Sequence, residues 1–169
     1  MAQSKTLTIR ATLEGDRSIH RDIEVDASKS LYKLAEAIIS SFGFSFDHAF
    51  GFYTGLTPAR MMRVLPKYEL FADMGEADPG VLSVKKTTIV QAFPVVGHTM
   101  LFLFDYGDEW HFRVSCRGTG SKVARVRYPR ITASQGEAPE QYPDPETDAE
   151  DMPTYGVNPV TGEKIYFRR

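Results

Sequence analysis

The chain has 169 residues and a formal net charge of −2, and its 42% hydrophobic and 25% charged residues are the proportions of an ordinary soluble protein. This length allows one sizeable core and not two, so one domain with tails is expected. No apolar run approaches the roughly 18 residues of a membrane span, and residues 1–10 lack the apolar core of a signal peptide, which predicts a cytoplasmic protein. The single cysteine, Cys116, fits a reducing compartment and excludes an internal disulfide or a zinc site built on cysteine pairs.

Charge is unevenly distributed in the C-terminal part of the chain. Residues 110–136 contain no acidic side chain but hold six basic ones, namely Arg113, Arg117, Lys122, Arg125, Arg127 and Arg130. Residues 143–153 reverse this balance, with five acidic side chains and no basic one. Composition therefore predicts a folded domain over residues 1–142 and an acidic, flexible tail over residues 143–169.

The first predicted elements are two strands and a helix. Residues 6–13 alternate apolar and polar side chains, and residues 19–25 follow after a turn at Glu14-Gly15-Asp16, which predicts an antiparallel pair. Residues 26–44 repeat apolar side chains at helical spacing. We expect Ser28 or Ser30 to cap this helix and Gly43 to end it in the left-handed conformation.

The middle of the chain is less regular. Residues 44–53 are rich in aromatic side chains and predict a strand, whereas residues 60–65 fit either a short strand or a helical turn. Residues 75–80 read as a loop, and residues 85–93 predict a short helix capped by Thr87 or Thr88.

The clearest feature of the chain is a hairpin over residues 99–117. Residues 100–104 are apolar at every position, which predicts a strand buried on both faces. Side chains alternate from residue 110 onward, and the inward face holds Trp110, Phe112, Val114 and Cys116. We expect Gly107 to supply the positive φ of a tight turn. A loop of two or four residues would pair Leu103 with Trp110, and a loop of three would pair Phe104 with Trp110.

After the hairpin, residues 118–121 predict a flexible turn and residues 122–128 an edge strand whose charges discourage association. Residues 155–167 regain aromatic side chains and predict a short hairpin or a partner-binding segment. The expected fold class is α+β: a single compact domain with a largely antiparallel sheet packed on one main helix plus short helices, and an irregular acidic C-terminal tail.

Two hypotheses for function follow from these patterns. Clustered arginines suit phosphate contacts, and Arg113 and Arg117 are expected on the same strand face as His111, so the first hypothesis is a non-catalytic binding module for nucleic acid or protein. The alternative is that the six basic residues lie on an ordinary edge strand, where their charges are solvated and need no ligand. The acidic tail is expected to compete with nucleic acid for the basic segment.

The second hypothesis is a small metal-dependent hydrolase that gathers His48, Asp105, Asp108 and His111. Carboxylates and imidazoles hold manganese, iron or zinc and activate water. The alternative is structural, because Asp105, Gly107, Asp108 and Trp110 form a hairpin motif in which the aspartates bond turn N–H groups. No cofactor is predicted, the sequence leans against an enzyme, and it contains no phosphate-binding glycine loop or dinucleotide fingerprint.

Several segments together resemble the Ri-plasmid ORF-3-like family. They are Arg21-Asp22-Ile23-Glu24-Val25, Leu31 to Ile39, Asp47-His48-Ala49-Phe50, Phe104-Asp105-Tyr106-Gly107-Asp108-Glu109-Trp110, Tyr128-Pro129-Arg130 and Ala138-Pro139-Glu140. The resemblance implies an α+β domain in which the hairpin and first helix share a core. It also implies a mobile-element or genome-maintenance setting, since members are labelled as passengers of mobile elements and some as resolvases.

The chain departs from that family pattern at His20 and at Gln141-Tyr142, and it lacks the cysteines that some relatives carry near the C-terminal segment. A serine recombinase needs an activated serine and a separate DNA-binding element. The sequence shows neither a nucleophile context nor a helix-turn-helix, so a catalytic resolvase is not expected, while a role beside one stays open.

Overall fold

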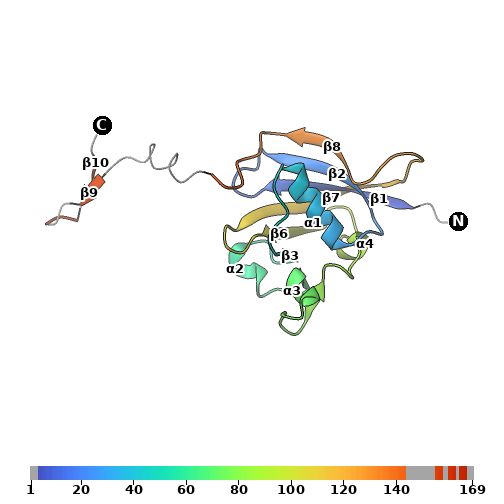
Figure 1. Cartoon of the computed structure of the whole chain (residues 1–169), viewed down its shortest axis with the longest axis horizontal. Coiled ribbons are helices and arrows are strands. Elements are labelled where there is room, and N and C mark those ends of the chain that lie inside the picture. Colours follow the sequence, from blue (N-terminus) through green and yellow to red (C-terminus); the bar gives the residue numbers. More distant parts are fainter. Residues whose placement is uncertain (1–3, 144–154, 158–159, 163, 167–169) are drawn as a thin grey trace. The chain divides into compact units, whose positions relative to one another are not determined.

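An eight-stranded sheet organises the N-terminal unit of the computed structural model (Figure 1). The structure describes residues 4–143, 155–157, 160–162 and 164–166. All neighbouring strands are antiparallel except β4 and β5, which confirms the largely antiparallel α+β prediction. The strand order is β5-β4-β3-β6-β7-β1-β2-β8, with β1 (Lys5–Leu13), β2 (His20–Asp26), β3 (Phe50–Tyr53), β4 (Lys67–Glu69), β5 (Val81–Ser83), β6 (Thr99–Phe104), β7 (Trp110–Ser121) and β8 (Arg130–Gln135).

Two helices of this unit begin at residues that the sequence marks as caps, Ser30 and Thr88. The Oγ atom of Ser30 accepts a hydrogen bond from the backbone N–H of Lys33, and Gly43 follows the helix with a φ of +73°. Thr88 and Gln91 form a reciprocal capping box. None of the helices in the described part of the chain has the length and apolar character that crossing a bilayer needs. The helices are α1 (Leu31–Ser41), α2 (Pro58–Met61), α3 (Leu70–Asp73) and α4 (Ile89–Ala92).

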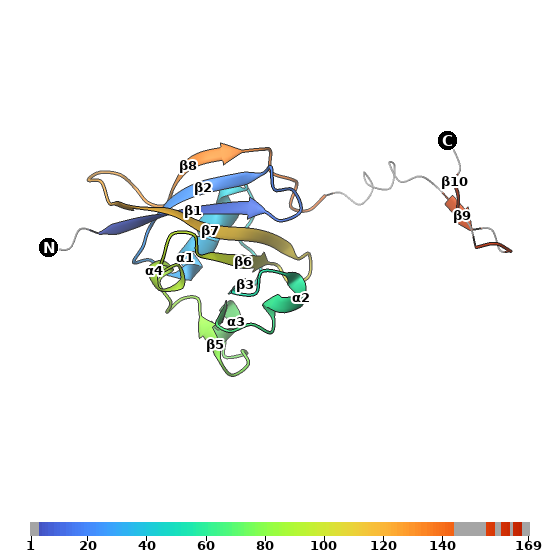
Figure 2. The same ribbon diagram turned by 180° about the vertical axis from the view of Figure 1, so that it is seen from behind.

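The main core lies between α1 and one face of the sheet (Figures 1 and 2). Buried residues recur every three or four positions along α1, so they form one apolar stripe on the helix. Its buried residues share a cluster with side chains from strands β1, β2, β6 and β7, including Ile9, Ile23, Phe102 and Phe112. A second cluster on the opposite side of β6 contains Leu101, Leu103, Tyr53 and Met61. The strand β6 is therefore buried on both faces, as its uninterrupted apolar run predicts.

The hairpin loop spans residues 105–109, and Phe104 pairs with Trp110. Positive φ values occur at Asp105 (+63°) and Glu109 (+54°), whereas Gly107 has none, so the expectation for this glycine is wrong. The cause is local: Asp105 Oδ1 accepts hydrogen bonds from the backbone N–H groups of Gly107 and Asp108 and holds the left-handed turn itself.

Two predictions for the segment after the hairpin are also wrong. Residues 118–121 are not a turn, because β7 continues through them and pairs with β1. A Cβ atom on Gly120 would lie 2.9 Å from Thr6 Oγ1, so glycine permits this close strand approach. Residues 122–128 form an unpaired connection instead of a strand, with Arg125 at a left-handed φ of +67°, and the edge strand is β8.

The second unit spans residues 139–169 and contains an antiparallel hairpin of β9 (Tyr155–Val157) and β10 (Lys164–Tyr166). This hairpin confirms the structural prediction for residues 155–167, and Gly162 takes a φ of +72°. Most of the acidic segment, residues 144–153, lies outside the described residues. The domain boundary predicted after residue 142 and the tail's competition with nucleic acid stay predictions.

Candidate functional site

His48 and Asp105 lie close together although they are 57 positions apart in the chain. Pairing of Phe50 with Phe104 aligns β3 and β6, and Asp105 N–H donates to Ala49 C=O at 2.9 Å. His48 Nε2 lies 3.5 Å from Asp105 Oδ2, and His48 Nδ1 lies 2.8 Å from Asp47 Oδ1. The hydrogen bond with Asp47 and the charge of Asp105 raise the pKa of His48 above its ordinary value, which favours the imidazolium form.

The geometry nevertheless does not assemble the four predicted hydrolase residues. Asp105 is buried, and its Oδ1 atom is occupied by the turn N–H groups. His48 lines a hollow beside Tyr32 and Phe46, whereas Asp108 and His111 line a different one. Within the described ranges, no group of three or more His, Cys, Asp or Glu side chains is arranged to hold a metal ion.

Three of the six predicted basic residues are held by carboxylates from the first two strands and their turn. Arg113 donates to Glu14 at 2.9 and 3.2 Å, Lys122 lies 2.8 Å from Asp26, and Arg130 lies 2.6 Å from Glu24. The ion pair between Arg10 and Asp22 adds to this set. The hydrogen bond from Arg113 lowers the pKa of Glu14, so the pair stays charged at neutral pH. Half of the predicted cluster of basic residues is therefore compensated by acidic partners.

The other three basic residues, Arg117, Arg125 and Arg127, are exposed and make no ion pair in the part of the chain that the structure describes. Arg117 is the extra residue of a β-bulge, because Cys116 pairs with Ile9 and Gly118 pairs with Thr8. Arg125 and Arg127 lie in the connection between β7 and β8. These guanidinium groups remain available to an anion.

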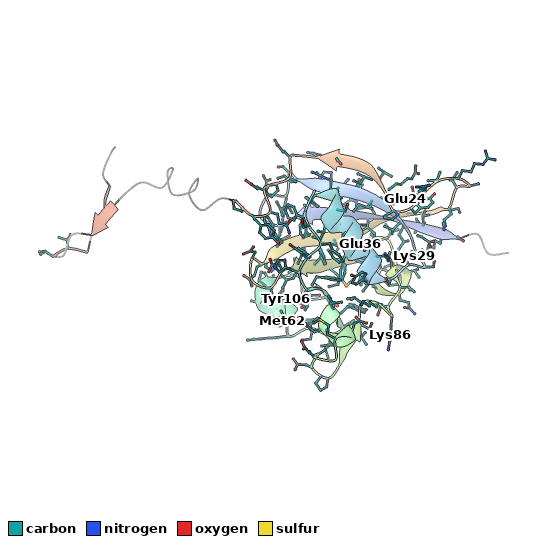
Figure 3. The ribbon with its side chains drawn as sticks, in the orientation of Figure 1. Glu24, Lys29, Glu36, Met62, Lys86 and Tyr106 are labelled. Carbon is teal, nitrogen blue, oxygen red and sulfur yellow. The ribbon has the colours of Figure 1, made fainter. Side chains whose placement is uncertain are left out.

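A groove runs between α1 and this connection, and we call it the basic groove. Its lining residues are Lys29, Lys33, Glu36, Ala37, Ser40, Tyr128 and Pro129. The ring centroid of Tyr128 lies 5.8 Å from both Lys122 Nζ and Arg130 Cζ, and its hydroxyl accepts from Val123 N–H. Lys29 lies just before α1, and Glu36, whose carboxylate is 3.5 Å from Lys33 Nζ, lies further along the helix (Figure 3).

Sequence reasoning missed Lys29 and Lys33 as candidate site residues. Lys33 and Ala37 are four residues apart and lie on one side of α1, whereas Lys29 precedes the N-cap Ser30 and lies outside the helix. A lysine is ordinary on a solvated helix face, so the sequence gives no special signal. The relation of both lysines to Tyr128, almost 100 residues later, comes from the fold.

A buried network of two tyrosines and a glutamate was missed as well. The Tyr53 hydroxyl donates to Glu69 Oε1 at 2.9 Å and lies 2.7 Å from the Tyr106 hydroxyl, which therefore acts as its donor. Burial raises the pKa of both tyrosines, so they remain protonated. A Cβ atom on Gly51 would lie 2.7 Å from the Tyr53 hydroxyl, so this network requires glycine in β3. It joins β3, β4 and the hairpin loop, which is a structural role.

The mostly antiparallel sheet and its one main helix define this chain as an α+β protein. The sequence profile of the plasmid pRiA4b ORF-3-like protein family matches residues 5–147, so the chain belongs to this family and the resemblance seen in its motifs is confirmed. No curated protein matches the sequence. A similar fold occurs in the crystal structure of the protein of unknown function MM3350 from Methanosarcina mazei Go1. The TM-score is 0.64 at 21% identity, over 81% of this chain and 72% of that one.

Proposed function

We propose that this protein is a non-catalytic binding module, acting in a mobile-element or genome-maintenance setting, whose basic groove receives single-stranded nucleic acid. The observation that carries the proposal is a groove between two distant segments, one of which lines it with lysines and the other with an aromatic ring beside exposed arginines. Lys29 precedes α1, Lys33 lies in its first turn, and Tyr128 comes from the connection that also holds Arg125 and Arg127. Lysine and arginine beside an aromatic ring match the phosphates and bases of a single strand.

The charge balance around the groove supports an anionic partner. Glu36 is an acidic lining residue that faces Lys33, and Asp26 is engaged with Lys122. Lys29, Arg125 and Arg127 keep exposed charges without an ion pair among the described residues. A phosphate chain would release counterions from these groups, which is the main source of affinity for nucleic acid.

The hydrolase hypothesis is less favoured. His48 reaches Asp105, but the turn occupies one oxygen of that carboxylate, and His111 lines another hollow. A catalytic metal site needs three protein ligands around one point.

The experiment compares two fourfold variants of the full chain in fluorescence-anisotropy titrations with labelled oligothymidylate. The groove variant is K29Q/K33Q/R125Q/R127Q. The control, K5Q/R60Q/R63Q/K86Q, removes the same charge from exposed residues that lie neither in the groove lining nor in the connection after β7. We expect the groove variant to lose most affinity and to flatten the salt dependence by about 0.7 in slope for each lost phosphate contact. The control should bind much as the natural chain does.

Equal weakening by both variants would contradict the groove, since it would indicate a general charge effect. If the natural chain does not bind at low salt, nucleic acid is excluded as the partner and a protein partner becomes the alternative. Duplex DNA of the same length serves as the comparison, and we expect it to bind less tightly than the single strand because its stacked bases cannot reach Tyr128.

A further inference from the structure

The outermost strand of the sheet, β8, has one edge without a neighbouring strand. It is bonded to β2 on one side, and no other strand among the described residues lies beside it (Figure 1). The backbone N–H and C=O groups that point away from β2 therefore have no backbone partner in the described part of the chain. A row of such groups accepts a further strand readily.

This edge lacks the usual protection. Natural edge strands are kept from pairing by charged side chains, proline or short length. The opposite edge strand, β5, has only three residues, whereas β8 has six. Residues 131–135 carry neither a charge nor a proline. The basic residues that the sequence suggested as edge protection lie mainly in the connection before β8, so they do not guard this edge.

A β-bulge in β8 does not close the edge either. Asp22 pairs with Ala133 and Ile23 pairs with Ile131, so Thr132 is the extra residue. The hydroxyl of Thr132 donates to the carbonyl of Asp22 at 3.3 Å. The irregularity is therefore compensated on the β2 side of the strand, and the outward side remains open.

The side chains beside this edge are uncovered as well. Every residue of β8 is exposed, and Ile131 is 51% exposed although it shares a face of the sheet with the buried Ile23 opposite. A hollow of about 150 Å³ lies next to it, and its lining includes Ala37 and Ser41 from α1. An added strand would cover Ile131 on the side that α1 leaves open.

The charges before and after β8 favour a second copy of the chain as the added strand. Arg125 and Arg127 precede β8, Glu137 follows it, and these exposed side chains make no ion pair with the described residues. Antiparallel pairing of two β8 strands would place the acidic end of each beside the basic end of the other, whereas parallel pairing would bring like charges together. A two-fold axis produces the antiparallel arrangement, because both copies then use the same surface.

We propose that two copies of this chain associate through antiparallel pairing of their β8 strands, which joins their sheets into one. Residue 130 of each copy lies opposite residue 135 of the other, and the two-fold axis passes between residues 132 and 133. The partner strand covers Ile131, and Glu137 approaches the partner's Arg127. The proposal goes beyond nucleic-acid binding and does not depend on it.

The test measures sedimentation velocity of the full chain, without nucleic acid, from about 10 μM to about 1 mM, because a contact of this size is small. We expect a monomer–dimer equilibrium. A133K should weaken association about tenfold or more, since the two added ammonium groups would lie side by side at the axis. The control, A59K, makes the same change at an exposed position of α2 and should associate as the natural chain does.

Hydrogen exchange identifies the edge that pairs. Amides of β8 should exchange more slowly at the high concentration than at the low one. E137K should weaken association without altering the strand itself, and R127E/E137K should restore it, because both charges are then reversed.

A natural chain that stays monomeric at every concentration would overturn the proposal and leave a foreign strand as the alternative occupant of this edge. Equal association of A133K and A59K would also overturn it, as would a dimer in which exchange of the β8 amides does not change with concentration. Failure of R127E/E137K to restore association would contradict the antiparallel arrangement.

Discussion

At the scale of single residues, long-range ion pairs decide which cations a partner could use. Arg113, Lys122 and Arg130 each pair with an acid 96 to 106 positions earlier. Sequence composition showed the basic block but not these partners, because they depend on how β7 and β8 align with β1 and β2. Burial raises the pKa of Asp26, but the hydrogen bonds from Lys122 and Ser28 outweigh it and lower this pKa to about 2.

The low pKa of Asp26 predicts a pH-dependent contribution to stability. The folded-state value lies below the ordinary value of 3.8, so the contribution is full above about pH 4 and is lost as pH falls toward 2. The difference corresponds to about 2 kcal/mol. We therefore expect D26N to lower the free energy of unfolding by about that amount at pH 7, measured by urea denaturation, and by much less near pH 2.5.

The matched control is D16N, because Asp16 makes the same turn with Ser18 that Asp26 makes with Ser28. Asp16 is exposed and has no basic partner among the described residues, so D16N should cost clearly less than D26N at pH 7. A D26N penalty that is the same at both pH values would show that its carboxylate charge is not the cause.

At the scale of elements, predictions succeeded where one apolar pattern determined one environment. The apolar stripe of α1, the apolar run of β6 and the alternating side chains of β7 each match the burial seen in the structure. The prediction failed where pairing depends on a distant strand, because Gly118 and Gly120 resemble a turn but extend β7. Residues 130–135, for which no element was predicted, lack apolar alternation but pair with β2.

Arg21 joins the edge strand β8 to the end of α1. Its guanidinium donates to the carbonyls of Ser41, His20 and Gln135 at 2.9 to 3.1 Å and lies 4.8 Å above the ring of Phe42. Lysine cannot reproduce this planar set of donors. We expect R21K to cost about 2–3 kcal/mol in urea denaturation and to accelerate hydrogen exchange of β8 amides.

R10K is the control for that substitution, since Arg10 lies on the adjacent strand in a partly exposed pair with Asp22. Its cost should stay below about 1 kcal/mol. If the two substitutions cost the same, or if β8 amides exchange at the natural rate in R21K, Arg21 does not tie the edge strand to α1.

At the scale of the whole molecule, the family and the α+β class were predictable because patterns and motifs extend over most of the chain. The candidate site was predictable only in part. The connection after β7 was expected to be basic, but the groove also needs Lys29 and Lys33, which the fold brings to Tyr128. The contact of His48 with Asp105 was anticipated as a cluster, yet its carboxylate serves the hairpin turn.

The most direct test of the central claim is chemical-shift mapping of the isotope-labelled full chain with a short oligothymidylate. The account predicts that amide shifts concentrate at residues 29–40 and 122–131, the two sides of the basic groove. Shifts centred instead on the face that carries Arg10, Asp22 and Arg117, or no shifts at low salt, would contradict it.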